Sequence, residues 1–233
     1  MTLLPSFPND STAIIIGASG GIGAAFVAHL KLQHNIINVI ELSRSQDDFD
    51  YTDENKVKFI ADKIDNQSID LIICATGFLG LEPEKSLKDL SMDKFQHIFA
   101  HNTFGPAMVM KYFTPKLKRD SKSVMAFLSA RVGSIEDNHI GGWYAYRASK
   151  SALNMVIRNA AIEIARTNKN ASIVGLHPGT VDTSLSKPFQ GMVPEGKLFT
   201  PEFSTESMLN VIDGLDDQST GNMFAYDGQK IPF

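Results

Sequence analysis

The chain has 233 residues, of which 43% are hydrophobic and 21% charged, so it can bury the core of one large domain. Its 22 basic and 26 acidic residues give a net charge of -4, which argues against nucleic acid or a membrane surface as a partner. The single cysteine, Cys74, excludes an intrachain disulfide and suits a reducing compartment. Residues 1–10 contain neither a basic stretch nor a long apolar run, so we expect no secretory signal and no membrane segment, and a cytoplasmic protein.

Short apolar runs alternate with longer helical patterns along the chain. The runs are rich in Val, Ile and Leu, which is typical of buried parallel strands, and they cover residues 13–16, 39–42, 57–60, 71–74, 124–128 and 173–176. Helical patterns cover residues 21–32, 92–117 and 146–167. This alternation predicts the α/β class, with a doubly wound parallel sheet flanked by helices in a single domain over residues 1–233.

The most irregular stretch covers residues 184–203, where three prolines and two glycines interrupt any periodic pattern. A long loop inside a compact domain is often functional, so we expect a substrate lid there. Its apolar side chains Phe189, Met192 and Phe199 are candidates to line the pocket beneath it. Thr200 followed by a proline predicts a helix start, and Gly214 predicts its end.

A glycine-rich turn, G-A-S-G-G-I-G, joins the first predicted strand to the first predicted helix and places Gly17, Gly21 and Gly23 there, with Ser19 and Ile22 between them. Glycines let the backbone turn tightly and approach a pyrophosphate at the N-terminus of a helix. The alternative is a glycine turn without a ligand, but the strand before it and the helix after it favour a dinucleotide site.

The end of the second predicted strand, E-L-S-R-S, indicates which dinucleotide is bound. A site for NAD(H) usually has an acidic residue there, whereas a 2′-phosphate needs a cation. Ser43 and Arg44 occupy that place, and a guanidinium can grip a phosphate through paired hydrogen bonds. Glu41 is a contrary signal, although it lies two residues earlier. We therefore expect NADP(H) rather than NAD(H).

Tyr146 and Lys150 lie four residues apart in the last long helical pattern, so they share a face of that helix. A nearby ammonium favours the phenolate and lowers the pKa of a tyrosine, which makes it a usable acid or base for a carbonyl oxygen. Trp143 and Tyr144, just before this helix, are candidates for either a substrate wall or core packing.

Four ordered motifs resemble those of the short-chain dehydrogenase/reductase family. They are G-x-x-x-G-x-G at residues 17–23, Asn102 in H-N-T-F-G-P, Y-R-A-S-K at 146–150, and P-G-T-V-D-T at 178–183. The stretches G-S-I-E-D-N-H-I-G-G-W-Y-A-Y-R-A-S-K, G-K-L-F-T-P-E and F-A-Y-D-G-Q-K-I-P-F are similar to its C-factor and sniffer-like carbonyl reductase branch. The resemblance covers nearly the whole chain and implies a Rossmann-type fold and an NADPH-dependent carbonyl reductase.

The resemblance also implies a role for each matching residue. Tyr146 would be the general acid that protonates the carbonyl oxygen, and Lys150 would lower the pKa of Tyr146 and bind the nicotinamide ribose. Asn102 would hold a water that links Lys150 to solvent. The remaining cofactor contacts would come from residues beside the nicotinamide and the cofactor backbone, namely Pro178, Gly179, Val181, Thr183 and Gly77.

The chain departs from the family pattern at two places. After the fourth predicted strand it has C-A-T-G at residues 74–77, which keeps Gly77 but lacks the asparagine that usually braces the sheet. After the strand of residues 124–128 it has S-A-R-V-G, so Ala130 stands where the family usually has its carbonyl-polarising serine. Ser129 fits the role by its place at the strand end and Ser134 by its distance from Tyr146, and the sequence leaves both open.

Two functions remain from the sequence. One is an NADPH-dependent reductase of an aldehyde or ketone, and the other is a dinucleotide-binding signalling or regulatory protein of the same fold with little turnover. The six histidines show no metal-ligand spacing, so we expect no metal site. Members of the family often assemble through their long helices, which implies a homodimer or homotetramer.

Overall fold

The computed structural model describes residues 2–80 and 82–233, and its centre is a seven-stranded sheet in the order β2-β1-β3-β4-β5-β8-β9. Neighbouring strands run parallel except β9, which pairs antiparallel with β8. The strands span Ser11–Ile16 (β1), Ile36–Leu42 (β2), Leu71–Cys74 (β3), Ser123–Leu128 (β4), Ala171–His177 (β5), Met223–Ala225 (β8) and Lys230–Ile231 (β9).

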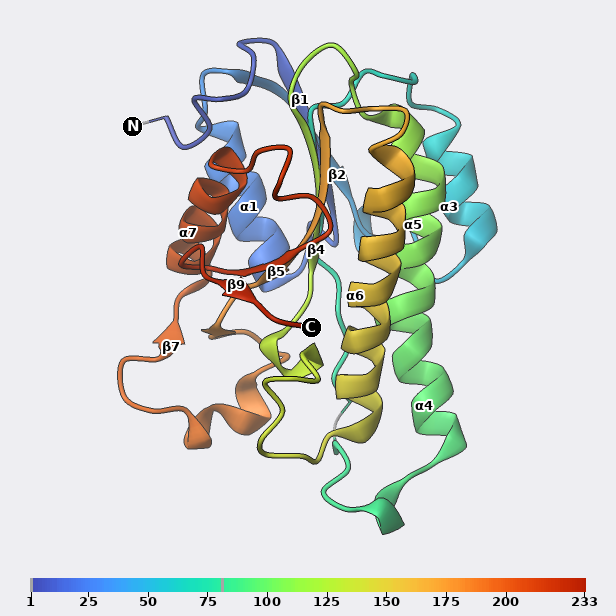
Figure 1. The fold of residues 1–233 in the computed structure, drawn as a ribbon, viewed down its shortest axis with the longest axis vertical. Helices are drawn as coiled ribbons and strands as arrows, with labels where there is room; N and C mark the ends of the chain where they lie inside the picture. The colour runs from blue at the N-terminus through green and yellow to red at the C-terminus, as the bar shows by residue number, and fades with distance from the viewer. Residues whose placement is uncertain (1, 81) are drawn as a thin grey trace.

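Helices cover both faces of this sheet (Figure 1). One face carries α1 (Gly21–Lys31) and α7 (Pro201–Asp213), and the other carries α3 (Glu54–Ala61), α5 (Gly105–Phe113) and α6 (Tyr144–Ile164). Alternate residues of β1 enter separate cores, with Ala13 and Ile15 facing α1 and α7 and Ile14 and Ile16 facing the opposite helices. The doubly wound α/β sheet predicted from the sequence is thus confirmed.

The strand predicted over residues 57–60 is wrong, because these residues form part of α3. The Asp53 carboxylate accepts hydrogen bonds from the backbone N–H groups of Asn55 and Lys56 and so starts a helix. Val57 and Ala61 then bury one face of that helix at helical spacing. A run of four apolar residues does not by itself distinguish a strand from a buried helical turn. Strands β8 and β9 escaped prediction because they are only three and two residues long.

The helix predicted over residues 92–117 is divided. It begins as α4 (Met92–Phe99), widens into a π turn over Ala100–Phe104, continues as α5 and ends in a 3-10 turn at Thr114–Lys116. Pro106 has no N–H with which to donate to the carbonyl of Asn102 four residues earlier, so a regular α-helix cannot continue through this point. The widened turn contains Asn102, the residue of the H-N-T-F-G-P motif that the family resemblance implies to be part of the site.

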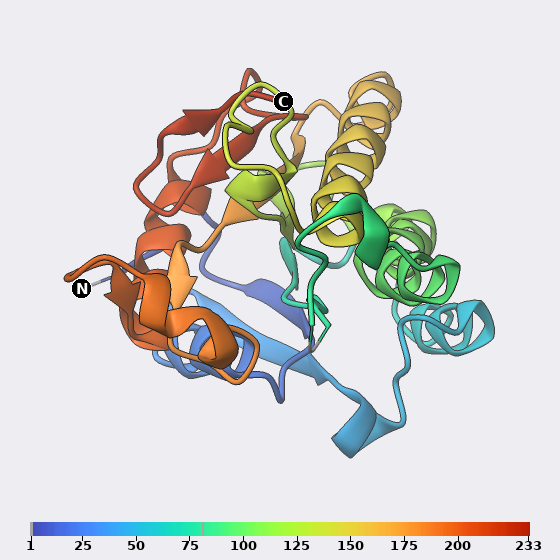
Figure 2. The same ribbon diagram turned by 90° about the horizontal axis from the view of Figure 1, so that it is seen from below.

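The carboxyl ends of the parallel strands meet at one edge of the sheet, the lower end in Figure 1 and the near side in Figure 2. The connections after β3, β4 and β5 gather there. A small pair, β6 (Thr180–Val181) with β7 (Leu198–Phe199), closes the base of the predicted lid, which contains a 3-10 turn over Lys187–Met192. The predicted helix after it is confirmed as α7, with Thr200 as its N-cap and Gly214 as its C-cap.

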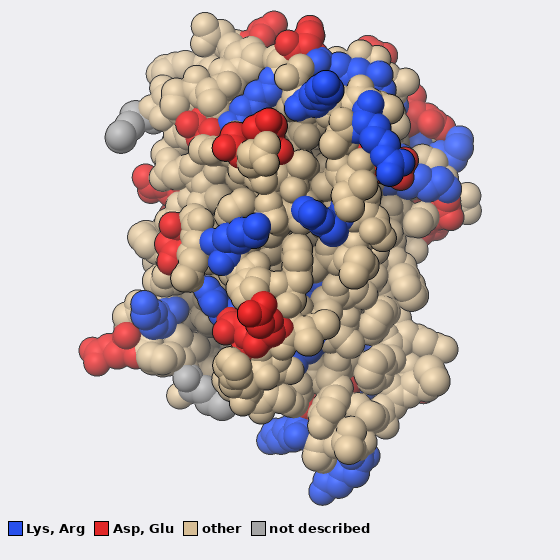
Figure 3. Space-filling view, viewed as in Figure 1, with Lys and Arg blue, Asp and Glu red and all other residues tan. Residues whose placement is uncertain are grey.

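Within residues 2–80 and 82–233, no helix has the length and apolar composition needed to cross a membrane. The same residues contain no group of three or more His, Cys, Asp or Glu side chains placed to hold a metal ion. On the face drawn in Figure 3, positive and negative side chains alternate rather than gather into a patch of one sign.

Candidate active site

The glycine turn between β1 and α1 depends on glycine at three positions. Gly17 has a φ of +86°, and a Cβ built on it would lie 2.9 Å from the carbonyl oxygen of Ala75. A Cβ on Gly23 would overlap the carbonyl of Gly17, and one on Gly21 would lie 2.9 Å from Cγ2 of Thr183. The turn therefore packs tightly against Ala75, directly after β3, and against the predicted site residue Thr183, which follows the β5 strand by six residues.

One cavity, of about 280 Å³, opens beside this turn at the end of β2. We call it the arginine cavity, and its lining includes five predicted residues, Gly17, Ser19, Ser43, Arg44 and Gly77. Ser45 also lines this cavity, and sequence reasoning missed four further lining residues, Phe49, Tyr51, Ala75 and Thr76. Phe49 and Tyr51 are aromatic residues in an otherwise polar loop, F-D-Y-T-D, and this was the signal in the sequence that could have identified them.

Arg44 begins the short helix α2 (Arg44–Asp47), and its exposed guanidinium makes no ion pair within the described part of the chain. Glu41, the contrary signal in the sequence, is instead paired with Lys31 of α1 at 2.5 Å. Glu41 is not in the lining of the arginine cavity, whereas Ser43 and Arg44 are. The free cation, and not the carboxylate, faces this cavity.

A second cavity, of about 180 Å³, lies on the other side of the glycine turn, and we call it the tyrosine cavity. Predicted residues in its wall are Ile22, Ser129, Tyr146, Pro178, Gly179, Val181 and Thr183. Ala130 is also there, and the rest of the wall is mainly apolar, formed by Leu79, Val132, Trp143, Leu185 and Phe189.

The lid contributes Phe189 to this wall, and its ring centroid lies 5.0 Å from that of Trp143. Phe199 does not line the cavity as expected, because its ring packs against Tyr226 at a centroid distance of 4.7 Å and against Gly179. The side chain of Met192 lies outside what the structure describes. The lid therefore closes the cavity through an aromatic contact with the start of α6.

Tyr146 and Lys150 lie one turn apart on α6 and are both buried. Lys150 Nζ donates a hydrogen bond to the Leu128 carbonyl at 2.8 Å, and a Cβ on Gly77 would lie 3.5 Å from Nζ. Burial raises the pKa of Tyr146 to about 12 and lowers the pKa of Lys150 to about 8. The expected lowering of the tyrosine pKa by the ammonium is thus outweighed by burial, because Nζ is held against the Leu128 carbonyl, 5.9 Å from the centre of the Tyr146 ring.

Asn102 is fully buried in the π turn, and both the oxygen and the nitrogen of its side-chain amide form hydrogen bonds. Its Oδ1 accepts from the Phe78 N–H at 2.8 Å, and its Nδ2 donates to the Phe78 carbonyl at 2.8 Å and to Ser149 Oγ at 3.0 Å. The side chain thus fastens the chain after β3, next to Gly77, to the helix that carries Tyr146 and Lys150.

The two candidate serines lie in different surroundings. Ser129 is in the wall of the tyrosine cavity, and its hydroxyl donates to Oδ1 of Asn154 at 2.7 Å. Ser134 is buried and accepts a hydrogen bond from the Asp137 N–H at 3.0 Å, and it is not in the wall of either cavity. Of the two serines, only Ser129 lines the tyrosine cavity, and its hydroxyl proton is donated to Asn154.

The N-terminus of α6 has no cap from its own sequence, since Trp143 stands at the N-cap with a φ of +52°. A remote residue, Glu84, supplies the missing partners: its backbone carbonyl accepts from the Trp143 N–H at 2.6 Å, and its Oε2 accepts from the Ala145 N–H at 3.3 Å. Glu84 is buried, so the loop after β3 fixes the first turn of the helix on which Tyr146 lies.

His177, the last residue of β5, also lines the tyrosine cavity and was not predicted as a site residue. Its position directly before the P-G-T-V-D-T motif was the available signal. Burial, followed by the charge of Arg131, lowers the pKa of His177 to about 4. The imidazole is therefore neutral at neutral pH.

Comparisons with known proteins agree with this geometry. The short chain dehydrogenase family model matches residues 46–193. C-signal of Myxococcus xanthus is 33% identical over 165 residues, which cover 71% of this chain and 93% of C-signal. The NADPH-bound carbonyl reductase from chicken fatty liver superposes with a TM-score of 0.81 at 23% identity, covering 95% of this chain and 98% of that one. The carbonyl reductase Sniffer of D. melanogaster has a TM-score of 0.74 at 21% identity, and the match covers 96% of this chain and 99% of Sniffer.

The ordered motifs, the doubly wound sheet and these matches lead to one conclusion: the chain belongs to the short-chain dehydrogenase/reductase family of oxidoreductases.

Proposed function

We propose that the protein is an NADPH-dependent carbonyl reductase that converts small or hydrophobic aldehydes and ketones to alcohols. The observation that carries the proposal is the position of Tyr146, which lines the tyrosine cavity together with Ile22 and Thr183. Thr183 also touches the glycine turn at Gly21. An acid for a carbonyl oxygen therefore lies beside the cofactor turn, as proton and hydride delivery to one carbonyl group requires.

The residues present fit a nicotinamide dinucleotide. Glycine leaves the backbone bare at the N-terminus of α1, where the N-cap Gly20 makes no side-chain hydrogen bond and the first N–H groups can meet a pyrophosphate. The arginine cavity and the tyrosine cavity flank this turn, so Arg44 and Ser43 would hold the adenosine end and Ile22, Pro178, Gly179, Val181 and Thr183 the nicotinamide end. When bound, the reduced nicotinamide supplies the hydride.

The chain itself supplies the proton. Because burial raises the pKa of Tyr146 to about 12, its phenol keeps the proton at neutral pH and can donate it to the carbonyl oxygen. This protonation state favours reduction over the reverse oxidation, which needs the phenolate. Lys150, whose pKa is about 8, is charged at neutral pH and stabilises the negative charge that develops on Tyr146 when the proton leaves.

The preference for NADPH over NADH follows from the unpaired guanidinium of Arg44 in the arginine cavity. A 2′-phosphate would receive charge-assisted hydrogen bonds from it, which a 2′-hydroxyl does not require. We expect Arg44→Ala to weaken NADPH binding about tenfold while NADH binding changes little, measured by nicotinamide fluorescence titration. Equal losses for both dinucleotides would contradict this assignment.

The apolar wall of the tyrosine cavity supports a hydrophobic substrate. Beyond the Trp143–Phe189 contact lies a further hollow of about 650 Å³, lined on its outer side by charged residues, Glu82, Lys85, Asp89 and Lys94. A substrate with its carbonyl at Tyr146 and a longer tail would reach this hollow only after the Trp143 and Phe189 rings move apart.

A panel of aldehydes and ketones with NADPH, followed at the nicotinamide absorbance, tests the proposed activity. We expect turnover that Tyr146→Phe lowers by about 10³-fold, because the general acid is lost. The second candidate, a dinucleotide-binding signalling or regulatory protein, is favoured by the alanine at position 130 and by the similarity to C-signal. Tight NADPH binding without turnover of any carbonyl would support that candidate instead.

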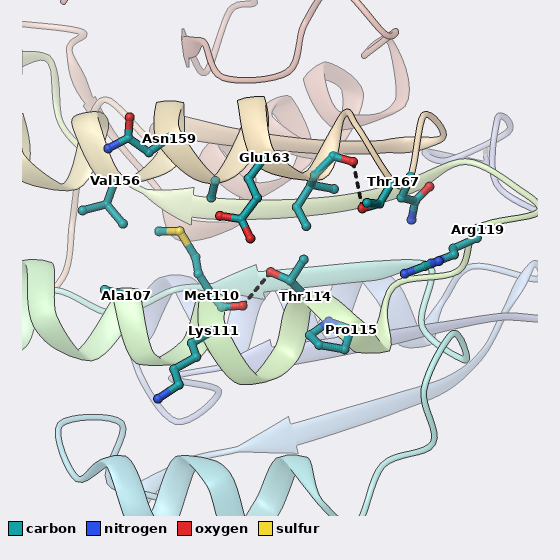
Figure 4. A pocket seen from close by; sticks show the side chains of 13 residues that line it. Ala107, Met110, Lys111, Thr114, Pro115, Arg119, Val156, Asn159, Glu163 and Thr167 are labelled. Carbon is teal, nitrogen blue, oxygen red and sulfur yellow. Dashed lines mark hydrogen bonds between the residues drawn. The ribbon is translucent and has the colours of Figure 1, made fainter.

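We also propose that the chain forms a homodimer or homotetramer through α5 and α6. A groove of about 450 Å³ runs between these helices on the side away from the two cavities. Figure 4 shows the residues that line it, with Val156, Asn159 and Glu163 of α6 on one side and Ala107, Met110 and Lys111 of α5 on the other. Thr167 and Thr114 line it just beyond the C-terminal ends of these two helices. Exposed apolar side chains next to it, Phe104, Met155 and Ile162, support burial against a second copy. Light scattering should give a dimer or tetramer mass that a Met155→Glu/Ile162→Glu variant lowers.

A cytoplasmic location is the last part of the proposal. Its support is Cys74, the one cysteine of the chain, which is buried with a free thiol and whose pKa burial raises to about 11. Cell fractionation followed by immunoblotting measures this directly, and recovery in a membrane or secreted fraction would contradict it.

A further inference from the structure

The tyrosine cavity needs a second hydrogen-bond donor for a carbonyl oxygen, and its serines do not supply one. Position 130, in the cavity wall, is an alanine. Ser129 donates to Asn154 Oδ1 at 2.7 Å, Ser186 donates to the backbone carbonyl of Val181, and Ser134 is outside the wall. Since a removed oxyanion donor commonly costs about 10²–10³ in rate, a reductase with only Tyr146 at the oxygen would be slow.

His177 is placed to fill this need. It ends β5, directly beside the end of β4, because Leu128 pairs with Leu176 and the Ser129 N–H donates to the Leu176 carbonyl at 2.8 Å. The last residue of one strand thus neighbours the serine at the end of the next. Both side chains line the cavity that Tyr146 also lines.

The two nitrogens of the His177 ring differ in their surroundings. Nδ1 is fully enclosed and has no hydrogen-bond partner, while Nε2 is not enclosed and makes no hydrogen bond within the described residues. The ring is neutral, since burial and the guanidinium of Arg131 both lower its pKa and the carboxylate of Asp227 opposes them only weakly. A neutral imidazole has one N–H, and a fully enclosed donor without a partner costs more free energy than one that is less enclosed, so the proton belongs on Nε2.

We propose that His177 donates the second hydrogen bond to the substrate carbonyl oxygen through its Nε2–H, beside the proton that Tyr146 delivers. The role rests on the proposed reductase function and makes His177 a catalytic residue of the tyrosine cavity. A neutral N–H suits this task because it polarises the carbonyl without placing a full positive charge in an apolar wall.

The first test needs no turnover. ¹⁵N NMR of histidine-labelled protein, with His177 assigned from the signal lost in His177→Gln, reports the charge and tautomer of the ring. We expect a neutral ring protonated on Nε2 at pH 7. A proton on Nδ1, or a cationic ring at pH 7, would overturn the proposal whether or not the protein reduces carbonyls.

The second test compares His177→Leu, which removes the donor, with His177→Gln, whose amide N–H extends to about the position of Nε2. We expect His177→Leu to lower kcat by about 10²-fold and His177→Gln by less than about tenfold, with KM and the Kd for NADPH nearly unchanged in both. Adding Ala130→Ser to His177→Leu should restore at least about tenfold, because a hydroxyl then supplies the missing donor.

Equal losses in His177→Leu and His177→Gln without rescue by Ala130→Ser would show a packing role and overturn the proposal, as would an unchanged kcat in His177→Leu. The proposed reductase function fails separately, if Tyr146→Phe turns over as fast as the wild-type protein. His34→Leu, the same change at an exposed histidine outside both cavities, is the control, and its kcat should stay within about threefold of wild type.

Discussion

Helix α6 and the segment from the end of β4 to Ser134 both contribute residues to the tyrosine cavity, and they hold their polar side chains in different ways. On α6, helix geometry alone places Tyr146 and Lys150 one turn apart. At the end of β4, each serine takes its direction from a separate partner, Ser129 from Asn154 and Ser134 from Asp137. Spacing along a helix is therefore enough to place two side chains on one face, whereas the direction of a side chain in a turn depends on which groups lie beside it.

The largest expected effect tests the α6 wall. We expect Lys150→Met to lower kcat/KM for carbonyl reduction by about 10²-fold or more, because the positive charge that stabilises the developing phenolate of Tyr146 is removed. Lys169→Met, the same change at an exposed lysine beyond α6, should have no effect. Steady-state kinetics with NADPH measure both variants. Equal rates in the two would contradict a role for the Lys150 charge in the reaction.

The contact between α6 and the turn after β4 is tested at Gly133. A Cβ at this position would lie 2.7 Å from Lys150 Cβ and 2.9 Å from the Lys150 carbonyl carbon, so the turn after β4 presses on the backbone of α6. Gly133→Ala should lower the free energy of unfolding by about 2–3 kcal/mol, measured by urea denaturation. Gly191→Ala in the lid, where nothing lies within 4 Å, is the matched control and should change it little.

The burial of Lys150 predicts a pH dependence of stability. Its pKa is about 8 in the folded protein and about 10.4 in an unfolded chain. Between these pH values the unfolded state binds more protons, so the free energy of unfolding rises with pH. From about pH 8 to pH 10, the wild-type protein should gain about 2 kcal/mol relative to Lys150→Met. A difference that stays constant across urea titrations in this range would show that Lys150 is not desolvated.

The smallest effect concerns the turn after β4, at a serine outside the cavity wall. Ser134→Ala removes the acceptor for the Asp137 N–H and should lower the free energy of unfolding by about 1 kcal/mol while kcat stays within about twofold of wild type. Thermal unfolding and steady-state turnover check the two halves of this statement. A loss in kcat beyond that would give Ser134 a role at the cavity that its position does not suggest.

The same contrast explains what could be predicted from the sequence. The sheet, the glycine turn and the Tyr146–Lys150 pair follow from local patterns, since apolar runs, glycines and helical spacing each have a direct structural meaning. The strand expected at residues 57–60 was wrong because a single capping residue, Asp53, decided its conformation. His177 was missed because its importance comes from an alanine 47 residues earlier and from burial, neither of which is visible at the histidine itself.

Glu84, which supplies the cap for α6, has a consequence for the order of folding. The first turn of this helix receives its hydrogen-bond acceptors from a residue 61 positions before Ala145, so α6 cannot finish its N-terminal turn until the loop after β3 has docked. An intermediate with α6 formed but this loop detached would carry Tyr146 on a fraying end. The Ala145 amide should therefore exchange its hydrogen at the rate at which the loop opens, and its protection would report when the active site is assembled.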